Sequence, residues 1–340
     1  MSKNRILILH DERPKQKPPE ENQEIYNLHV EEDVRDALTR LGYPFETFAI
    51  DHSIKNLIDK IESTKPDLVM MLAECFGGNN AMEPHIIAIL EMLRVPYTGS
   101  NMFAISINCN KGIQKKILSY HGIKTPDFVT FPLGSRISIP ESLAFPLIVK
   151  PLEEDSSIGI HDCSVVKNLD ALTERVKFLY TNREQGAVVE TFIDGREFYV
   201  GILGNKNVQV LPIVELDLSG IPDGKPKIAS FRVKWNVDYR EKMNIQSVFP
   251  NNLTPEETRK IHDTCIKTYK VLGIQNYGRI DVRMSAHDGQ IYVLEANPNP
   301  WIAEGEDLAN AAEKAGMNFD TFILKIIDYG LAKKKKTVNK

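Results

Sequence analysis

The chain has 340 residues, of which 42% are hydrophobic and 26% are charged, which is enough apolar content for two or three folded domains. Its formal net charge is -4 and its acidic and basic residues are interspersed, so charge favours neither a nucleic acid nor a membrane surface as the main partner. No apolar run reaches the length of a membrane span or of a signal-peptide core. We therefore expect a folded, cytoplasmic protein that acts on small molecules.

The N-terminal third alternates short apolar strands with amphipathic helices. This alternation predicts a parallel sheet with helices on both faces, since parallel strands need helical crossovers. Strands are predicted over 5–10, 45–50 and 66–72, and helices over 31–41 and 85–93.

The middle of the chain is rich in β-branched strands. Residues 146–166 are predicted to form a hairpin with a long, mobile loop that ends at Gly159. Residues 186–193 and 196–204 are predicted to form a second pair of strands around an Asp-Gly turn. Residues 212–250 are rich in Pro, Gly and charge, which indicates an extended covering loop.

A helix over 254–273 has clear boundary signals. Thr254 is an expected N-cap, Glu257 completes a capping box and Gly273 ends the helix. A strand hairpin and a helix over 307–315 follow. The basic tail, residues 333–340, is expected to be solvated and disordered rather than a nucleic-acid contact.

The hairpin that ends in "LEAN" is the most informative element. Glu295 and Asn297 lie on one strand face because side chains alternate. A three-residue loop over 287–289, with Gly289 in the left-handed conformation, would place Asp281 opposite Glu295, whereas a two-residue Asp-Gly loop would put it on the other face. We predict the longer loop. Two carboxylates and an amide oxygen would suit Mg²⁺, although they could also be ordinary polar groups at an exposed strand end.

Two lysines and a Ser-rich turn suggest an anionic ligand. Lys150 ends an apolar strand, so it either reaches solvent or meets a phosphate. Lys111 opens a helix, where a cation is unfavourable unless an anion offsets it. Residues 156–159, "SSIG", offer hydroxyl and backbone N–H groups that could surround phosphate oxygens, but such turns are common at plain hairpin tips.

Three further side chains have both a functional and a structural interpretation. Glu190 ends a strand whose following backbone could face an adenine edge, and Glu197 could bind ribose hydroxyls. Both could equally be surface acids beside a turn. Arg279 shares the strand face of Asp281, where it could stabilise a phosphoryl group or form a salt bridge.

Five segments in order resemble the ATP-grasp ligases, and specifically the D-alanine-D-alanine ligase branch. The resemblance covers about residues 68–331 and implies an α/β and α+β architecture, with a parallel α/β domain ahead of two ATP-grasp lobes. We expect the parts to be residues 1–103, 104–186, 187–332 and the tail 333–340. The segments that carry the resemblance are "VPYTGSN", "LIVKPLEEDSSIGI", "VVETFIDGREFYVGILG", "YGRIDVRM" and "YVLEANPNP".

The resemblance also implies roles for individual residues. Arg279, Lys234 and Ser156 would be catalytic, and Asp281, Glu295 and Asn297 would hold one or two Mg²⁺ ions, with Mn²⁺ as a substitute. ATP would be bound by Lys111, Lys150, Ser156, Ser157, Ile158, Gly159, Glu190, Thr191, Phe192, Ile193, Glu197 and Leu294. The implied reaction phosphorylates a carboxylate and joins the resulting acyl phosphate to an amine, which requires positioning and electrostatics rather than a nucleophilic side chain.

The substrate half departs from the family pattern. The family usually has a Gly-Gly turn and a Glu and Ser pair near the N-terminus. This chain has no such turn, and Glu24 is only an approximate equivalent of the Glu. Trp235 stands where the family has a tyrosine after the covering-loop lysine. After Asn297 the family's Gly and Ser residues give way to Pro300, Trp301, Glu304, Gly305, Glu306 and Asp307. Because carboxylates repel a carboxylate, we hypothesise an acceptor that carries an extra amine or lacks a free carboxylate beside its nucleophile. Alternatively, Glu306 and Asp307 only cap the following helix.

Two other functions remain open at this point. The protein could be an authentic D-alanine-D-alanine ligase with a divergent pocket, or an ATP-binding protein without catalysis. The set of phosphate, metal and transition-state residues favours an enzyme over the second possibility. A homodimer is a further expectation from the resemblance.

Overall fold

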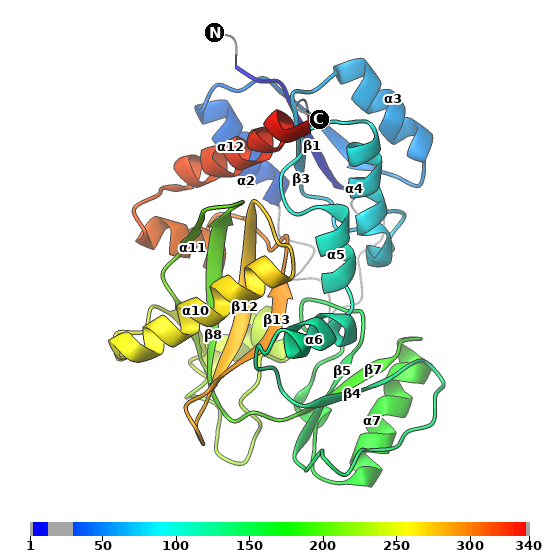
Figure 1. Cartoon of the computed structure of the whole chain (residues 1–340), viewed down its shortest axis with the longest axis vertical. Helices are drawn as coiled ribbons and strands as arrows, with labels where there is room; N and C mark the ends of the chain where they lie inside the picture. The colour runs from blue at the N-terminus through cyan, green and yellow to red at the C-terminus, as the bar shows by residue number, and fades with distance from the viewer. Residues whose placement is uncertain (1–2, 13–29, 338–340) are drawn as a thin grey trace.

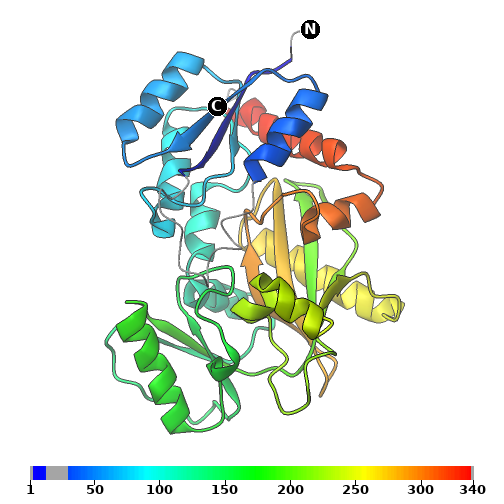
Figure 2. The same cartoon turned by 180° about the vertical axis from the view of Figure 1, so that it is seen from behind.

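The structure, a computed structural model, describes residues 3–12 and 30–337. An N-terminal domain lies above two lobes that sit side by side, and the last helix returns to the N-terminal domain (Figure 1). Figure 2 shows the same arrangement from behind. The architecture confirms the predicted combination of a parallel α/β domain with two mixed lobes.

The N-terminal sheet has the order β2-β1-β3, is parallel and is buried on both faces. Ile6 and Ile8 pack towards α2 and α12, whereas the alternate residues Leu7 and Leu9 pack towards α3 and α4. This alternation is why the strand is apolar throughout. The elements of this domain are β1 (Ile6–Asp11), α2 (Val30–Arg40), β2 (Phe45–Ile50), α3 (Ile54–Thr64), β3 (Leu68–Met71), the 3-10 helix η2 (Asn80–Met82), α4 (Glu83–Met92) and α12 (Phe319–Thr337).

The central lobe is an antiparallel sheet of order β4-β7-β5-β6 that is covered by α7. Helices α5 and α6 connect it to the N-terminal domain (Figure 1). The predicted hairpin over 146–166 is confirmed, because Leu147 pairs with Val166. The elements here are α5 (Met102–Asn108), α6 (Lys111–Tyr120), β4 (Phe128–Phe131), β5 (Leu147–Pro151), the 3-10 helix η3 (Asp162–Ser164), β6 (Val165–Val166), α7 (Leu169–Asn182) and β7 (Ala187–Thr191).

The C-terminal lobe is built on an antiparallel sheet of order β11-β10-β8-β12-β13, with β9 beside β8. Helix α10 covers one face of this sheet, and α8, α9 and α11 pack with residues of the other. The elements are β8 (Gly195–Gly204), β9 (Val208–Val210), β10 (Val214–Asp217), α8 (Phe231–Trp235), α9 (Val237–Lys242), β11 (Gln246–Val248), α10 (Pro255–Val271), β12 (Tyr277–Ser285), β13 (Ile291–Asn297) and α11 (Asp307–Lys314).

The predicted boundary signals of α10 are confirmed. The Thr254 hydroxyl accepts a hydrogen bond from the Glu257 N–H, and the Glu257 carboxylate accepts one from the Thr254 N–H, so the capping box is complete. These bonds satisfy N–H groups that have no partner within the helix.

Three expectations about the fold were wrong. The segments 186–193 and 196–204 do not pair with each other, because β7 lies between β4 and β5 whereas β8 lies between β10 and β12. The span 212–250 contains β10, α8, α9 and β11 rather than an extended loop alone. Lys333–Thr337 of the tail continue helix α12, where the Lys333 ammonium lies over the Tyr97 ring and donates to the Gly99 carbonyl. Residues 338–340 lie outside the described residues.

The register of the β12–β13 hairpin is the predicted one, but its cause differs. Asp281 lies opposite Glu295 and Gly289 has a φ of 64°, as expected. The Ser285 N–H, however, donates to the Gln290 carbonyl, so the loop has one residue more than predicted. Val282 then lies opposite Val293, which leaves Leu294 as an extra residue in a β-bulge. The additional loop residue alone would have placed Asp281 opposite Leu294, and the bulge restores its pairing with Glu295.

No helix within residues 3–12 and 30–337 is long and apolar enough to cross a membrane.

The start of β8 generates a prediction about glycine. Gly195 and Gly224 both have positive φ, at 147° and 87°. A Cβ at Gly195 would lie 2.0 Å from the Met284 carbonyl oxygen, whereas a Cβ at Gly224 would meet nothing within 4 Å. We expect Gly195→Ala to lower the free energy of unfolding by roughly 3 kcal/mol and Gly224→Ala by only about 1 kcal/mol. Urea denaturation followed by circular dichroism would compare them, and equal losses would contradict the crowding at Gly195.

Candidate active site

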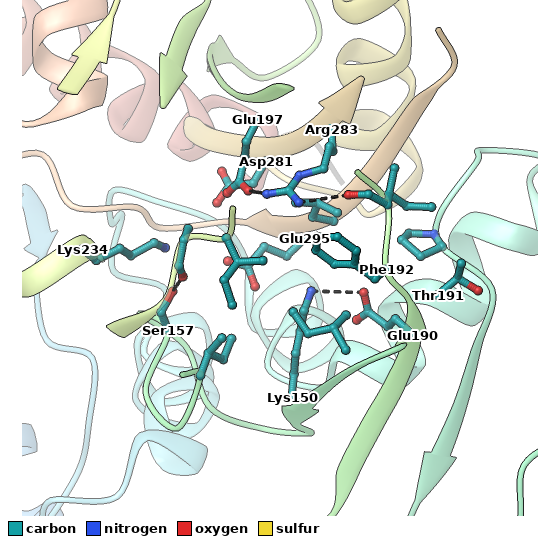
Figure 3. A pocket seen from close by; sticks show the side chains of 17 residues that line it. Lys150, Ser157, Glu190, Thr191, Phe192, Glu197, Lys234, Asp281, Arg283 and Glu295 are labelled. Atoms are coloured by element: carbon teal, nitrogen blue, oxygen red, sulfur yellow. Dashed lines mark hydrogen bonds and ion pairs between the residues drawn. The ribbon is translucent and has the colours of Figure 1, made fainter. Parts of the chain in front are cut away.

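A cavity lies between the sheets of the central and C-terminal lobes and is partly open to solvent. Strands β5 and β7 supply one wall, and β8, β12 and β13 supply the other (Figure 3). Apolar side chains alternate with charged ones around it, so the cavity can hold both a flat apolar group and an anion. Its lining residues are Pro126, Ile148, Lys150, Ser157, Ile160, Glu190, Thr191, Phe192, Ile193, Glu197, Ile228, Ala229, Lys234, Asp281, Arg283, Leu294 and Glu295.

A buried carboxylate shared by two lysines lies on one side of the cavity. The Glu190 carboxylate is 3.1 Å from the Lys150 ammonium and 3.3 Å from that of Lys115. Burial alone would raise the pKa of Glu190, but Lys115 and Lys150 hold it below its ordinary value. Burial also lowers the pKa of Lys115 to about 8, against the opposing effect of Glu190. The group therefore carries two cations for one anion.

The opposite wall holds a second buried ion pair. Arg283 donates to the Glu197 carboxylate and, over 3.0 Å, to the Ile193 carbonyl. The Tyr199 hydroxyl donates to the other Glu197 oxygen over 3.1 Å. Figure 3 shows Glu197 and Arg283 directed into the cavity from above. Glu197 is thus fixed in place, with one partner on each oxygen.

Asp281 of β12 and Glu295 of β13 lie opposite each other in the antiparallel pair. Arg279 binds both oxygens of Asp281, at 2.7 and 2.9 Å, so the proposed salt bridge of Arg279 is present. The Glu295 carboxylate is 3.4 Å from the Lys111 ammonium. Burial raises the pKa of Asp281. It would also raise the pKa of Glu295, but Lys111, Lys234 and Lys150 bring that pKa well below its ordinary value, so Glu295 is ionised.

The turn over residues 156–159 is closed against the segment that contains α8. Ser156 and Ser157 have φ angles of 54° and 59°. The Ser157 hydroxyl donates to the Ala229 carbonyl over 2.7 Å, and the Trp235 indole N–H donates to the Ser156 carbonyl over 2.8 Å. The turn therefore covers the cavity rather than projecting from a hairpin tip.

Beyond Trp235 the site continues into acidic surroundings. The Trp301 ring lies 5.2 Å from the Trp235 ring, and its N–H donates to Glu74. Burial and the neighbouring Asp11 raise the pKa of Glu74 to about 8. Glu306 occupies the N-cap position of α11 but makes no side-chain capping hydrogen bond. Capping therefore does not account for its carboxylate, whose pKa is raised by burial and by Asp307.

The predicted site residues fall into two groups, those that line the cavity and those that do not. Most line the cavity directly, whereas Lys111, Ser156, Ile158, Gly159, Arg279 and Asn297 do not. Glu24 lies outside the described residues. Sequence reasoning missed Lys115 and Arg283, both buried and both paired with predicted residues. A signal for Arg283 was available, because it lies two residues after Asp281 on the same strand.

The raised pKa of Glu74 makes stability depend on pH. The native state binds the Glu74 proton more tightly than the unfolded state, so this contribution is complete at low pH and is lost as pH rises towards about 8. Glu74→Gln carries no such proton. We expect its free energy of unfolding, relative to the unmodified protein, to rise between about pH 5 and pH 9. Urea denaturation at several pH values would test this, with the exposed Glu62→Gln as control. Parallel pH curves for all three proteins would contradict it.

Comparison with known proteins extends the resemblance over nearly the whole chain. The family model described as the D-ala D-ala ligase C-terminus matches residues 113–328. The chain is 31% identical to D-alanine-D-alanine ligase of Aquifex aeolicus over 295 residues, 86% of this chain and 92% of that one. It is also 31% identical to the uncharacterized protein y4sG of Sinorhizobium fredii over 261 residues, which cover 77% of this chain and 74% of the relative.

A solved structure shares the fold. The crystal structure of D-alanine-D-alanine ligase from Bacillus anthracis complexed with ATP matches with a TM-score of 0.76 and 24% identity, over 98% of this chain and 99% of that one. At this identity the match establishes the fold, and the family model and the Aquifex aeolicus relative establish the family. The chain therefore belongs to the D-alanine-D-alanine ligase family of ATP-grasp proteins.

Proposed function

We propose that the protein is an ATP- and Mg²⁺-dependent ligase that joins a carboxylate to an amine through an acyl phosphate. The observation that carries the proposal is the set of cations around one ionised carboxylate. Lys111, Lys234, Lys150 and Arg279 all lower the pKa of Glu295, which lines the cavity. Such a concentration of positive charge suits the triphosphate of ATP and the phosphoryl group in flight.

The adenosine part of ATP fits the apolar side of the cavity. Phe192 and Leu294 would form the walls around the base, with the backbone of residues 190–193 along its edge. Glu197 would accept hydrogen bonds from the ribose hydroxyls, because Arg283 and Tyr199 hold its carboxylate in one orientation. These assignments agree with the residues that line the cavity.

The phosphates would lie towards the Ser-rich turn. Lys150 reaches the cavity from β5, and Ser157 of the turn lines the same cavity (Figure 3). Lys111 lies behind, where it links Asp155 to Glu295 at 3.1 and 3.4 Å. The two lysines thus offset phosphate charge from different elements.

The residues at the ends of β12 and β13 fit Mg²⁺. Within residues 3–12 and 30–337, no three His, Cys, Asp or Glu side chains form a metal site by themselves. Asp281, Glu295 and the Asn297 amide instead offer two carboxylates and one further oxygen, which is how proteins hold Mg²⁺ beside phosphates. The buried Asn297 Nδ2 has no hydrogen-bond partner in the described part of the chain, so no internal bond fixes this amide. Bound Mg²⁺ would neutralise phosphate charge.

The chemistry then follows from charge and position. A carboxylate oxygen attacks the γ-phosphorus of ATP, ADP leaves, and the amine nitrogen attacks the acyl carbon of the acyl phosphate, which releases phosphate and leaves an amide. Arg279, held by Asp281, and Lys234, which extends from α8 towards the cavity, would offset the negative charge of the transferred group (Figure 3).

Loss of the central carboxylate tests this assignment. We expect Glu295→Gln to reduce amine-dependent ADP release at least about a hundredfold, because it removes the charge that the surrounding cations are matched to. A coupled assay for ADP would measure the rate, and the exposed Glu62→Gln would serve as control. Unchanged ADP release in Glu295→Gln would contradict the proposal.

We also propose an acceptor without a free carboxylate beside its nucleophile, or with an additional amine. Burial and Asp307 raise the pKa of Glu306, against the opposing effect of Arg279, Arg240 and Lys234. The side chain has no capping bond to account for its position. An amino group on the acceptor would be attracted to it, whereas a carboxylate would be repelled.

A product screen tests the substrate proposal. The protein would be incubated with ATP, Mg²⁺ and pooled amino acids, small acids and polyamines, and products would be identified by mass spectrometry. We expect a new mass equal to acid plus amine minus water, formed with an amine-rich acceptor, and reduced when Glu306→Gln removes the acidic group. D-alanyl-D-alanine as the efficient product would contradict the acceptor proposal while supporting the ligase chemistry.

A further inference from the structure

Glu190 is a buried anion with two buried cations, and these two cations are held very differently. The Glu190 and Lys115 side chains are 1% and 0% exposed, so neither can be compensated by solvent. Lys150, on the opposite side of the carboxylate, is 11% exposed and lines the cavity. The difference in partners between the two lysines indicates which one can move.

Lys115 is fully engaged. Its ammonium is 3.0 Å from the Thr125 hydroxyl, 3.0 Å from the Leu294 carbonyl and 3.3 Å from Glu190. The first two contacts are hydrogen bonds and the third is an ion pair, so Lys115 is held by three groups on separate segments. Leu294 is the residue of the β-bulge, and its carbonyl is therefore free of the regular strand pairing. Lys115 thereby ties α6 to both lobes.

Lys150 has one partner in the described part of the chain, the Glu190 carboxylate at 3.1 Å. Two of its N–H groups are left for another acceptor. Figure 3 shows its ammonium at the cavity, with a single dashed contact to Glu190. Lys150 can therefore turn to an anion that enters the cavity, whereas Lys115 cannot.

We propose that Lys115 is a positioning residue that serves as the permanent counter-ion of Glu190, so that Lys150 can leave this carboxylate for the phosphates of a nucleotide. The inference rests on the proposed function of the cavity. Lys115 lies outside the lining of the cavity, so it acts through Glu190 and Lys150 rather than on the nucleotide.

The physical reason is the cost of a buried unpaired charge. If Lys150 were the only cation beside Glu190, its departure would leave a carboxylate in the protein interior without a partner, which is strongly unfavourable. Glu190 would then retain Lys150 and compete with the phosphates. With Lys115 in place, the carboxylate stays paired in both positions of Lys150.

The test compares ligands that differ only in phosphate. Dissociation constants of ATP and adenosine would be measured by calorimetry for the unmodified protein, Lys115→Met and Lys116→Met. We expect Lys115→Met to weaken ATP binding by about tenfold or more while adenosine changes by less than about twofold. The adjacent Lys116 is exposed, so Lys116→Met should leave both affinities unchanged.

A second variant separates this role from simple packing. In the double variant Lys115→Met/Glu190→Gln, the carboxylate charge that would retain Lys150 is absent. The ATP affinity of this double variant should therefore be close to that of Glu190→Gln alone. If Lys115→Met does not fold, Lys115→Gln keeps hydrogen-bond donors without the charge and carries the same expectation. Circular dichroism would confirm folding.

The alternative outcomes are distinct. Equal weakening of ATP and adenosine, unchanged ATP affinity, or no recovery in the double variant would each overturn the counter-ion role while leaving the proposed ligase intact. Failure of the unmodified protein to bind either ATP or adenosine would overturn the proposed function, and the counter-ion role with it.

Discussion

Pairing of buried charges is the constraint on which the cavity depends. Glu190 needs Lys115 and Lys150, Glu197 needs Arg283, and Asp281 needs Arg279. A buried carboxylate without its cation would be expensive, so each pair holds its carboxylate in a fixed position beside the cavity. Helix α6 joins the two lobes, because its Lys111 pairs with Glu295 of β13 at 3.4 Å and its Lys115 donates to the Leu294 carbonyl over 3.0 Å.

The sequence was sufficient where structure is local. The capping box of α10 and the left-handed Gly289 depend on a few neighbouring residues, and both are confirmed. The pairing of Asp281 with Glu295 was also predicted correctly, although the prediction assumed a hairpin loop that is one residue too short. A bulge at Leu294 compensated for the additional loop residue. Two local irregularities that cancel cannot be distinguished from a regular hairpin by side-chain alternation alone.

Contacts distant in the chain were less predictable. Strands β7 and β8 are adjacent in sequence, yet they join different sheets because their pairing edges are occupied by β4 and β5, and by β10 and β12. Lys115 precedes another lysine on an amphipathic helix, a pattern typical of an exposed face, but α6 is covered on that side by β13. Burial of this kind follows from tertiary packing, which the local sequence does not encode.

We propose that nucleotide phosphates enter the cavity between the two lobes and draw Lys150 away from Glu190. The most direct measurement is a crystal structure of the protein with a non-hydrolysable ATP analogue and Mn²⁺, whose anomalous signal locates the metal. We expect the base between Phe192 and Leu294, a phosphate oxygen on Lys150, and Mn²⁺ between Asp281 and Glu295. A nucleotide bound elsewhere, or one in the cavity with Lys150 still on Glu190, would contradict it.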